Sequence, residues 1–108
     1  MKILFVCAAG MSTSILMKKV EKWGEANQID LEVKAVGTQV YQDVYQDYDC
    51  ILIGPQISYM LDKFKDSVSI PVGVISGSDY ALGNAENIYK FSQSLISKKG
   101  GSKNEFTE

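Results

Sequence analysis

A single cysteine stands at the start of a segment whose composition suits the binding of phosphate. Cys7 follows the apolar run 3–6, and small and hydroxyl-bearing residues come directly after it. If a helix begins within that segment, its unpaired N–H groups would bind phosphate and lower the pKa of a nearby thiol. We therefore expect Cys7 to be the reacting thiol, and we expect these residues to bind a phosphoryl group: Ala8, Ala9, Gly10, Met11, Ser12, Thr13 and Ser14.

The types of these residues fit that chemistry individually. Gly10 adopts a positive φ at little cost, so the backbone N–H groups around it can form a nest for phosphoryl oxygens. The hydroxyls of Ser12, Thr13 and Ser14 add donors. Phosphoryl transfer depends mainly on positioning and electrostatic stabilisation, which such a loop supplies. The alternative is that Cys7 is only a small buried residue that ends a core strand.

Two residue types are missing from the chain, and their absence excludes some kinds of catalytic and metal-binding site. The sequence has no His and no Arg, so all eleven basic residues are Lys. A Cys–His catalytic pair within this chain is excluded, and no imidazole is available as a metal ligand. The two cysteines, Cys7 and Cys50, match no zinc-binding pattern. We expect neither a metal nor a cofactor.

The second cysteine has a different setting. Cys50 begins the apolar run 50–53 and would lie at the end of its strand remote from the ligand edge. We interpret it as inert packing. A disulfide with Cys7 is not expected, because the two residues would stand near opposite ends of adjacent parallel strands.

Further contacts to a bound anion are expected from the ends of two later strands. Gln56 and Tyr59 follow the third apolar run, and Tyr80 follows the fourth. Packing or turn formation is an equally simple role for Gln56 and Tyr59. Asp79 could act as an acid, but we favour a capping role for it in the final helical region.

Length and composition indicate one ordinary globular domain. The chain has 108 residues, 45% hydrophobic and 22% charged, with a net charge of −2. It contains neither a run long enough to span a bilayer nor a secretory signal, so we expect a cytoplasmic protein. The charge argues against nucleic acid as a partner, and we expect a monomer.

Short apolar runs alternate with helical patterns along the chain. The runs read as strands buried on both faces, and helix caps and apolar spacing mark the segments between them. Strands are predicted at 2–6, 30–36, 50–53 and 72–75, and helices from 12–14 to 24–28 and at 39–48, 57–64 and 84–98.

This alternation predicts an α/β fold with right-handed crossovers. We expect a small flavodoxin-like domain: an open, parallel, four-stranded sheet in the order 2-1-3-4, flanked by helices. The loops after the first and third strands then meet near the centre of the ligand edge. The domain is expected to cover residues 1–99, followed by a flexible tail at 100–108, which lacks apolar periodicity.

Two motifs resemble those of a known family. The segment Cys-Ala-Ala-Gly-Met-Ser-Thr-Ser at 7–14, together with Gly-Pro-Gln-Ile-Ser-Tyr-Met-Leu at 54–61, resembles the lactose/cellobiose (chitobiose) type enzyme IIB of the bacterial phosphotransferase system. The resemblance covers residues 1 to about 99. It implies a phosphocarrier with a four-stranded parallel sheet, in which Cys7 matches the phosphorylated cysteine and 8–14 the phosphate loop.

The resemblance also implies partners. Cys7 would accept a phosphoryl group from a phosphohistidine of the EIIA protein. It would pass the group to a sugar held by the EIIC permease, at the inner face of the membrane. The sugar would be a disaccharide such as cellobiose, lactose or chitobiose. A histidine supplied by another protein would account for the lack of one in this chain.

Two alternatives from other classes remain open. Low-molecular-weight cysteine phosphatases and arsenate reductases also place a cysteine after the first strand, but they clamp phosphate with an Arg, where this chain has Thr13. An FMN-binding flavodoxin-like module would use the hydroxyl-rich loop for the flavin phosphate. Such a protein would be yellow.

Overall fold

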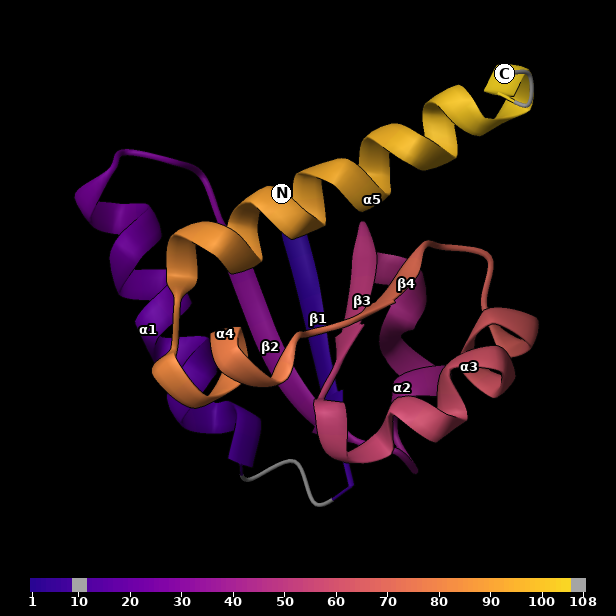
Figure 1. Ribbon diagram of the computed structural model, residues 1–108, viewed down its shortest axis with the longest axis horizontal. Helices are drawn as coiled ribbons and strands as arrows, with labels where there is room; N and C mark the ends of the chain where they lie inside the picture. The colour runs from indigo at the N-terminus through magenta and orange to yellow at the C-terminus, as the bar shows by residue number, and fades with distance from the viewer. Residues whose placement is uncertain (9–11, 106–108) are drawn as a thin grey trace.

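The computed structural model describes residues 1–8 and 12–105, and side chains over 1–8 and 14–97 (Figure 1). In chain order the elements are β1 (Lys2–Cys7), α1 (Ser12–Ala26), β2 (Glu32–Gly37), α2 (Tyr41–Val44), the 3-10 turn η1 (Tyr45–Asp47), β3 (Cys50–Ile53), the 3-10 turn η2 (Pro55–Met60), α3 (Leu61–Ser67), β4 (Val72–Val74), α4 (Gly77–Leu82) and α5 (Ala85–Glu105).

The four strands form one parallel sheet in the order β2-β1-β3-β4, which confirms the predicted topology. β1 is flanked on both sides, with Ile3 opposite Val33 on β2 and opposite Cys50 on β3. Lys2 is the one exposed residue of β1, and the five residues after it are buried. A strand paired on both edges and covered on both faces needs this continuous apolar run.

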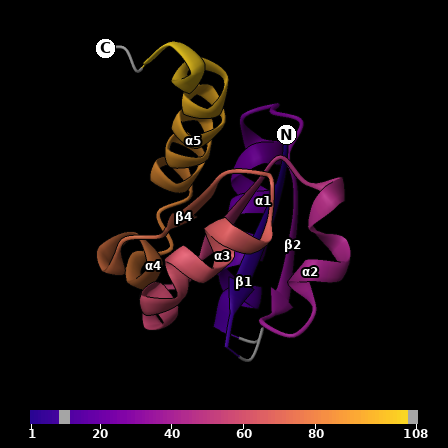
Figure 2. The ribbon, with the colours of Figure 1, turned by 90° about the vertical axis from the view of Figure 1, so that its right-hand side faces the viewer.

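Side chains of β1 alternate between two hydrophobic layers. Ile3 and Phe5 pack in the layer that contains Leu16 of α1 and Ile88 of α5. Leu4 and Val6 pack in the opposite layer, among the side chains of α2, η2 and α3: Tyr41, Ile57 and Phe64. Figure 2 shows α5 and α2 on opposite sides of the strands. Because strand side chains point alternately to the two faces, Cys7 belongs to the α1 and α5 side.

Two predicted helices differ from those in the structure. In the segment 39–48, α2 and η1 end at Asp47, and Tyr48 is extended with φ −120° and ψ 158°. The extension brings Asp49, just before β3, beside the start of β1, where its carboxylate accepts a hydrogen bond from Lys2 N at 2.7 Å. The helix expected at 57–64 is two elements, η2 and α3. Ile57 interrupts η2 with a non-helical φ of −118°, and its side chain is buried in the core.

The helix α4 was not predicted. Its first residues, Gly77, Ser78 and Asp79, favour turns rather than helix. Ser76 nevertheless caps it, because its hydroxyl accepts a hydrogen bond from Asp79 N at 3.1 Å. Gly83, with φ +63°, then ends the helix in the left-handed conformation that glycine adopts most easily.

The last helix is longer than predicted. Asn84 caps α5 by accepting a hydrogen bond from Asn87 N at 3.1 Å, and the helix continues to Glu105 instead of ending near residue 98. Figure 1 shows its final turns projecting beyond the sheet. Part of the segment expected to be a flexible tail therefore has helical backbone, while the domain boundary at residue 99 stays a prediction.

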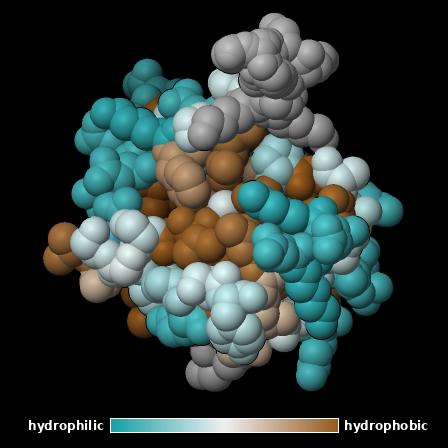
Figure 3. Space-filling model, turned by 45° about the vertical axis from the view of Figure 1, so that its right-hand side comes forward, coloured by the Kyte–Doolittle hydropathy of each residue, from teal (hydrophilic) through white to brown (hydrophobic). Residues whose placement is uncertain are grey.

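The β4 side of the molecule has an apolar surface. β4 is an edge strand with β3 as its one neighbour in the sheet. Ile70 and Val74 beside it are partly buried. Figure 3 turns this side partly toward the viewer and shows hydrophobic residues gathered near its middle.

Within residues 1–8 and 12–105, no helix is long and apolar enough to cross a membrane.

Candidate functional site

The candidate site lies where β1, β3 and β4 end, at the lower edge of the sheet in Figure 1. Backbone hydrogen bonds hold these ends together: Gly54 N donates to Val6 O at 3.1 Å, and Ile75 N donates to Ile53 O at 3.0 Å. Cys7 therefore neighbours the turn that follows β3. This is the edge at which open parallel sheets bind their ligands.

Cys7 is the last residue of β1 and carries a reduced thiol. Its side chain is only 3% exposed, although Ala8 directly after it is exposed in a bend. The cysteine thus stands at the boundary between the core and the loop that leads to α1. A buried position next to an exposed loop fits a nucleophile that must be held in place and still be reached.

The predicted phosphate loop is described in part. Ala9, Gly10 and Met11 lie outside the described residues. Ser12 and Thr13 have helical backbone in the first turn of α1, and the side chain of Ser14 is half-buried. The helix start predicted after Cys7 is confirmed, so the N–H groups of the first turn lie one short loop away from the thiol.

The side chains of the three residues predicted to contact the anion, Gln56, Tyr59 and Tyr80, lie in different environments. The side chain of Gln56 folds back toward Gly54: its Oε1 lies 2.7 Å from the point where a Cβ would stand on that glycine. Tyr59 is 81% exposed and extends into solvent. The ring of Tyr80 packs against the core layer on the α1 and α5 side, and its hydroxyl oxygen is buried. A role for each in anion binding stays a prediction.

Gly54 is a member of this site that sequence reasoning treated only as part of a turn. A Cβ at Gly54 would lie 3.7 Å from Tyr80 Cε2 and 3.8 Å from Cys7 Cβ. Cys7 and Tyr80 therefore both border Gly54, and Gln56 Oε1 takes up the room that a side chain at this glycine would need. The Gly-Pro pair after a buried strand was the available signal, but it did not show which side chains meet there.

Asp79 does not cap the final helix, where Asn84 is the capping residue, and a role for it as an acid stays a prediction. Ser76 is the capping residue of α4, and the carboxylate of Asp79 accepts a hydrogen bond from Asn87 Nδ2 at 3.0 Å. This bond ties α4 to α5. The Ser76–Tyr80 segment, expected to be a loop, is thereby a fixed support for the Tyr80 side chain.

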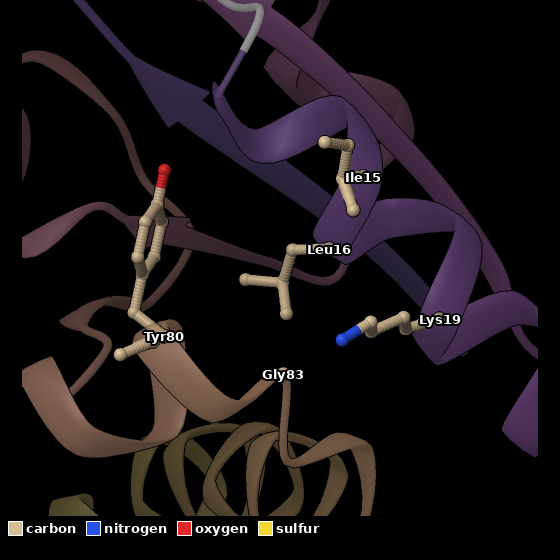
Figure 4. Close-up of a pocket in the computed structure, with 6 residues that line it drawn as sticks. Ile15, Leu16, Lys19, Tyr80 and Gly83 are labelled. Atoms are coloured by element: carbon tan, nitrogen blue, oxygen red, sulfur yellow. The ribbon is translucent and has the colours of Figure 1, made fainter.

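A hollow of about 150 Å³ lies beside the site, between α1 and α4. Figure 4 shows Leu16 and Lys19 on α1 facing Tyr80 and Gly83 across it. Two large apolar side chains near this region are exposed: Ile15 by 69% and Leu82 by 72%. Sequence reasoning did not identify this hollow, because it arises from the packing of a helix that was not predicted.

Cys50 lies far from the site, as predicted. It pairs with Ile3 at the opposite end of β1, four residues and roughly 13 Å along the strand from Cys7. Burial raises the pKa of the Cys50 thiol to about 12, against the opposing effect of a hydrogen bond with Ser92. Such a thiol stays protonated and unreactive at neutral pH.

The site as described offers a thiol, a helix start and a buried hydroxyl at one sheet edge. Among the described residues, no three His, Cys, Asp or Glu side chains form a group that would hold a metal ion. The arrangement suits covalent chemistry at Cys7 on a group that N–H donors at the start of α1 could stabilise.

Comparisons with known proteins agree with this description. The sequence model of the family "PTS system, Lactose/Cellobiose specific IIB subunit" matches residues 2–91. The oligo-beta-mannoside-specific EIIB component of Bacillus subtilis is 34% identical over 98 residues, which cover 88% of this chain and 95% of that protein.

A solved structure and a longer relative extend the comparison. The solution structure of the cellobiose-specific IIB component of Borrelia burgdorferi superposes with a TM-score of 0.77 at 29% identity, covering 92% of this chain and 94% of that one. The lactose-specific EIICB component of Staphylococcus haemolyticus is 26% identical over 72% of this chain, which corresponds to 14% of that protein.

The named sugar differs among these relatives, whereas the EIIB assignment is common to them. With a family match over residues 2–91 and a sheet of the same topology, the chain belongs to the lactose/cellobiose-type EIIB components of the phosphotransferase system, which are phosphocarriers and sugar phosphotransferases.

Proposed function

We propose that Cys7 is the residue that carries the phosphoryl group. The observation that supports this is the position of Cys7: a buried thiol at the carboxyl end of a central strand, next to the exposed Ala8 and five positions before the start of α1. Loop and helix N–H groups would surround the phosphoryl oxygens, together with the hydroxyls expected from Ser12, Thr13 and Ser14.

The first transfer brings the phosphoryl group to Cys7. The Cys7 thiolate attacks the phosphorus of a phosphohistidine on EIIA, the new P–S bond forms as the P–N bond breaks, and the electron pair of that bond leaves on the imidazole. No base from this chain is required once the thiol is ionised, which agrees with the lack of His in the sequence.

The second transfer passes the group to a sugar held by EIIC. The sugar hydroxyl attacks phosphorus, the P–S bond breaks, and Cys7 leaves as the thiolate while the hydroxyl proton passes to a base outside this chain. A partnership with EIIC is supported by the Staphylococcus haemolyticus relative, which is named an EIICB component. The chain would then work at the inner face of the membrane, and we expect it to be monomeric by itself.

The sugar is proposed to be a disaccharide such as cellobiose, lactose or chitobiose. The names of relatives support a sugar as the acceptor without fixing its class, since they include oligo-beta-mannoside, galactose, cellobiose and lactose. A phosphocysteine must survive until the sugar arrives. The lack of an Arg clamp in this chain favours such a carrier over a phosphatase, which needs that clamp for hydrolysis.

Intact mass spectrometry tests the role of Cys7. The chain is incubated with phosphoenolpyruvate, the general phosphotransferase proteins and the EIIA of its system. We expect a gain of one phosphate, lost in Cys7→Ser and retained in Cys50→Ser, the matched change at the other cysteine. A gain that persists in Cys7→Ser, or no gain in the wild type, contradicts the proposal.

The acceptor is tested by adding membranes that contain EIIC and a panel of sugars. Loss of the protein phosphate in the presence of cellobiose, lactose, chitobiose or an oligo-beta-mannoside would identify the substrate. Release of inorganic phosphate at the same rate without EIIC would instead support the phosphatase alternative. A yellow purified protein would support an FMN-binding module.

A further inference from the structure

The hydroxyl of Tyr80 is buried without a hydrogen-bond partner. Within the part of the chain whose side chains are described, no other buried side-chain nitrogen or oxygen lacks a hydrogen-bond partner. A buried tyrosine O–H normally finds an acceptor, because leaving the donor unpaired in the interior costs free energy. An unpaired hydroxyl in a folded protein therefore suggests an acceptor that arrives only during function.

Tyr80 is placed beside the reacting thiol. Its Cε2 atom and the Cβ of Cys7 lie 3.7 Å and 3.8 Å from the same point, the position that a Cβ on Gly54 would take. Cys7 and the Tyr80 ring also belong to the same side of the sheet, the side covered by α1 and α5. In Figure 4 the hydroxyl points away from Gly83 and Lys19, toward the side on which α1 begins.

The support beneath Tyr80 holds this orientation. Tyr80 N donates to Ser76 O at 2.9 Å, and Asp79 next to it is bonded to Asn87 of α5. The chain turns at Gly83 immediately after α4. The ring is packed against the core layer, so these contacts hold the side chain in the orientation that Figure 4 shows.

We propose that the Tyr80 hydroxyl donates a hydrogen bond to the phosphoryl group carried on Cys7. This inference rests on the proposed phosphocysteine. In the unphosphorylated chain the donor is buried and unpaired, whereas a charged phosphoryl oxygen one P–S bond beyond the thiol gives it a strong acceptor. The hydroxyl thus favours the phosphorylated state over the unphosphorylated one, and it positions the group that Cys7 passes on.

The first test measures the equilibrium of phosphoryl transfer between EIIA and this chain by intact mass. In Tyr80→Phe we expect the equilibrium to move toward phosphorylated EIIA by on the order of tenfold, the size of a hydrogen bond to a charged group. Tyr45→Phe is the matched control: it removes the hydroxyl of a partly buried tyrosine that packs in the opposite hydrophobic layer, and we expect no shift.

The second test measures thermal unfolding of the unphosphorylated chains. Because Tyr80→Phe removes a buried donor that has no partner, its melting temperature should equal or exceed that of the wild type. A hydroxyl with a purely structural role would lower it. An unchanged transfer equilibrium in Tyr80→Phe, or a lower melting temperature, overturns the inference alone. A wild-type chain that gains no phosphate overturns the proposed function and this inference with it.

Discussion

The two cysteines lie on the same side of the sheet but in opposite chemical settings. Cys7 stands at the edge where loops and helix starts meet, whereas Cys50 begins β3 among core side chains. Burial raises the pKa of the Cys50 thiol to about 12, a hydrogen bond with Ser92 lowers it, and the carboxylate of Asp49 raises it further. Position along the strand therefore separates the thiol that we propose to react from an inert one.

This raised pKa has a consequence for stability at alkaline pH. Between an ordinary thiol pKa of 9.0 and the folded value of about 12, unfolding lets Cys50 release a proton that the folded chain retains. The contribution of the protonated Cys50 thiol to the free energy of unfolding is therefore complete below pH 9, and it is lost as the pH rises toward 12. Over this window the free energy of unfolding falls by up to about 1.4 kcal/mol per pH unit.

Urea unfolding at pH 8 to 10.5 checks this expectation. The wild type should lose stability with pH more steeply than Cys50→Ala, whatever the cost of the smaller side chain at pH 7. The tyrosines titrate in both proteins, so the difference between the two slopes isolates the thiol. Equal slopes would mean that Cys50 ionises as readily in the folded chain as in the unfolded one.

At the scale of elements, the contact between β4 and α5 depends on a glycine. Gly73 is buried in β4, and a Cβ there would lie 2.6 Å from Phe91 Cζ and 2.7 Å from Leu95 Cδ1 of α5. Both distances are far below ordinary contact. The absence of a side chain at this position is what lets α5 lie close against the short edge strand.

Gly73→Ala is therefore expected to destabilise the fold by about 1–3 kcal/mol, the usual cost of overpacking a core. Gly77→Ala is the matched control, because a Cβ at this first residue of α4 meets nothing within 4 Å. It should leave stability unchanged or raise it by up to about 1 kcal/mol. Urea unfolding followed by the fluorescence of Trp23 measures both. If Gly73→Ala leaves the free energy of unfolding unchanged, α5 can shift away from β4 without cost.

At the scale of the whole molecule, the sheet order brings the ends of β1, β3 and β4 to one edge, while helices cover both faces. The site is assembled from the segments that follow three strands, and its Tyr80 is supported by a hydrogen bond between α4 and α5. α5 thus packs in the core and also holds α4, which carries Tyr80, in place. Among its described side chains, which run to residue 97, the last two that pack against the core are Leu95 and Ile96.

Truncation tests whether the functional domain ends near residue 99. Removing residues 100–108 should leave the free energy of unfolding within about 0.5 kcal/mol and leave phosphorylation unchanged. Removing residues 95–108 also deletes Leu95 and Ile96, and should cost about 2 kcal/mol or more. A large loss in the shorter truncation would place the end of the domain beyond residue 99.

Much of the fold was predictable because it depends on local apolar runs. The runs at 2–6 and 50–53 are buried on both faces, and they identified the central strands to within one residue. The helix α4 was missed because Gly77, Ser78 and Asp79 have low helix propensity, and tertiary contacts decide their conformation. The same applies to Ile57, whose burial interrupts a regular pattern.

The sequence by itself determined the reacting residue that we propose, the order of the strands and the family, because these depend on neighbouring residue types: a thiol, a small hydroxyl-rich segment and buried runs. Only the tertiary structure decided which distant side chains meet Cys7. Tyr80 is 73 positions away in the chain and reaches Gly54 through the packing of α4. Such a contact depends on how elements pack against one another, which no local pattern encodes.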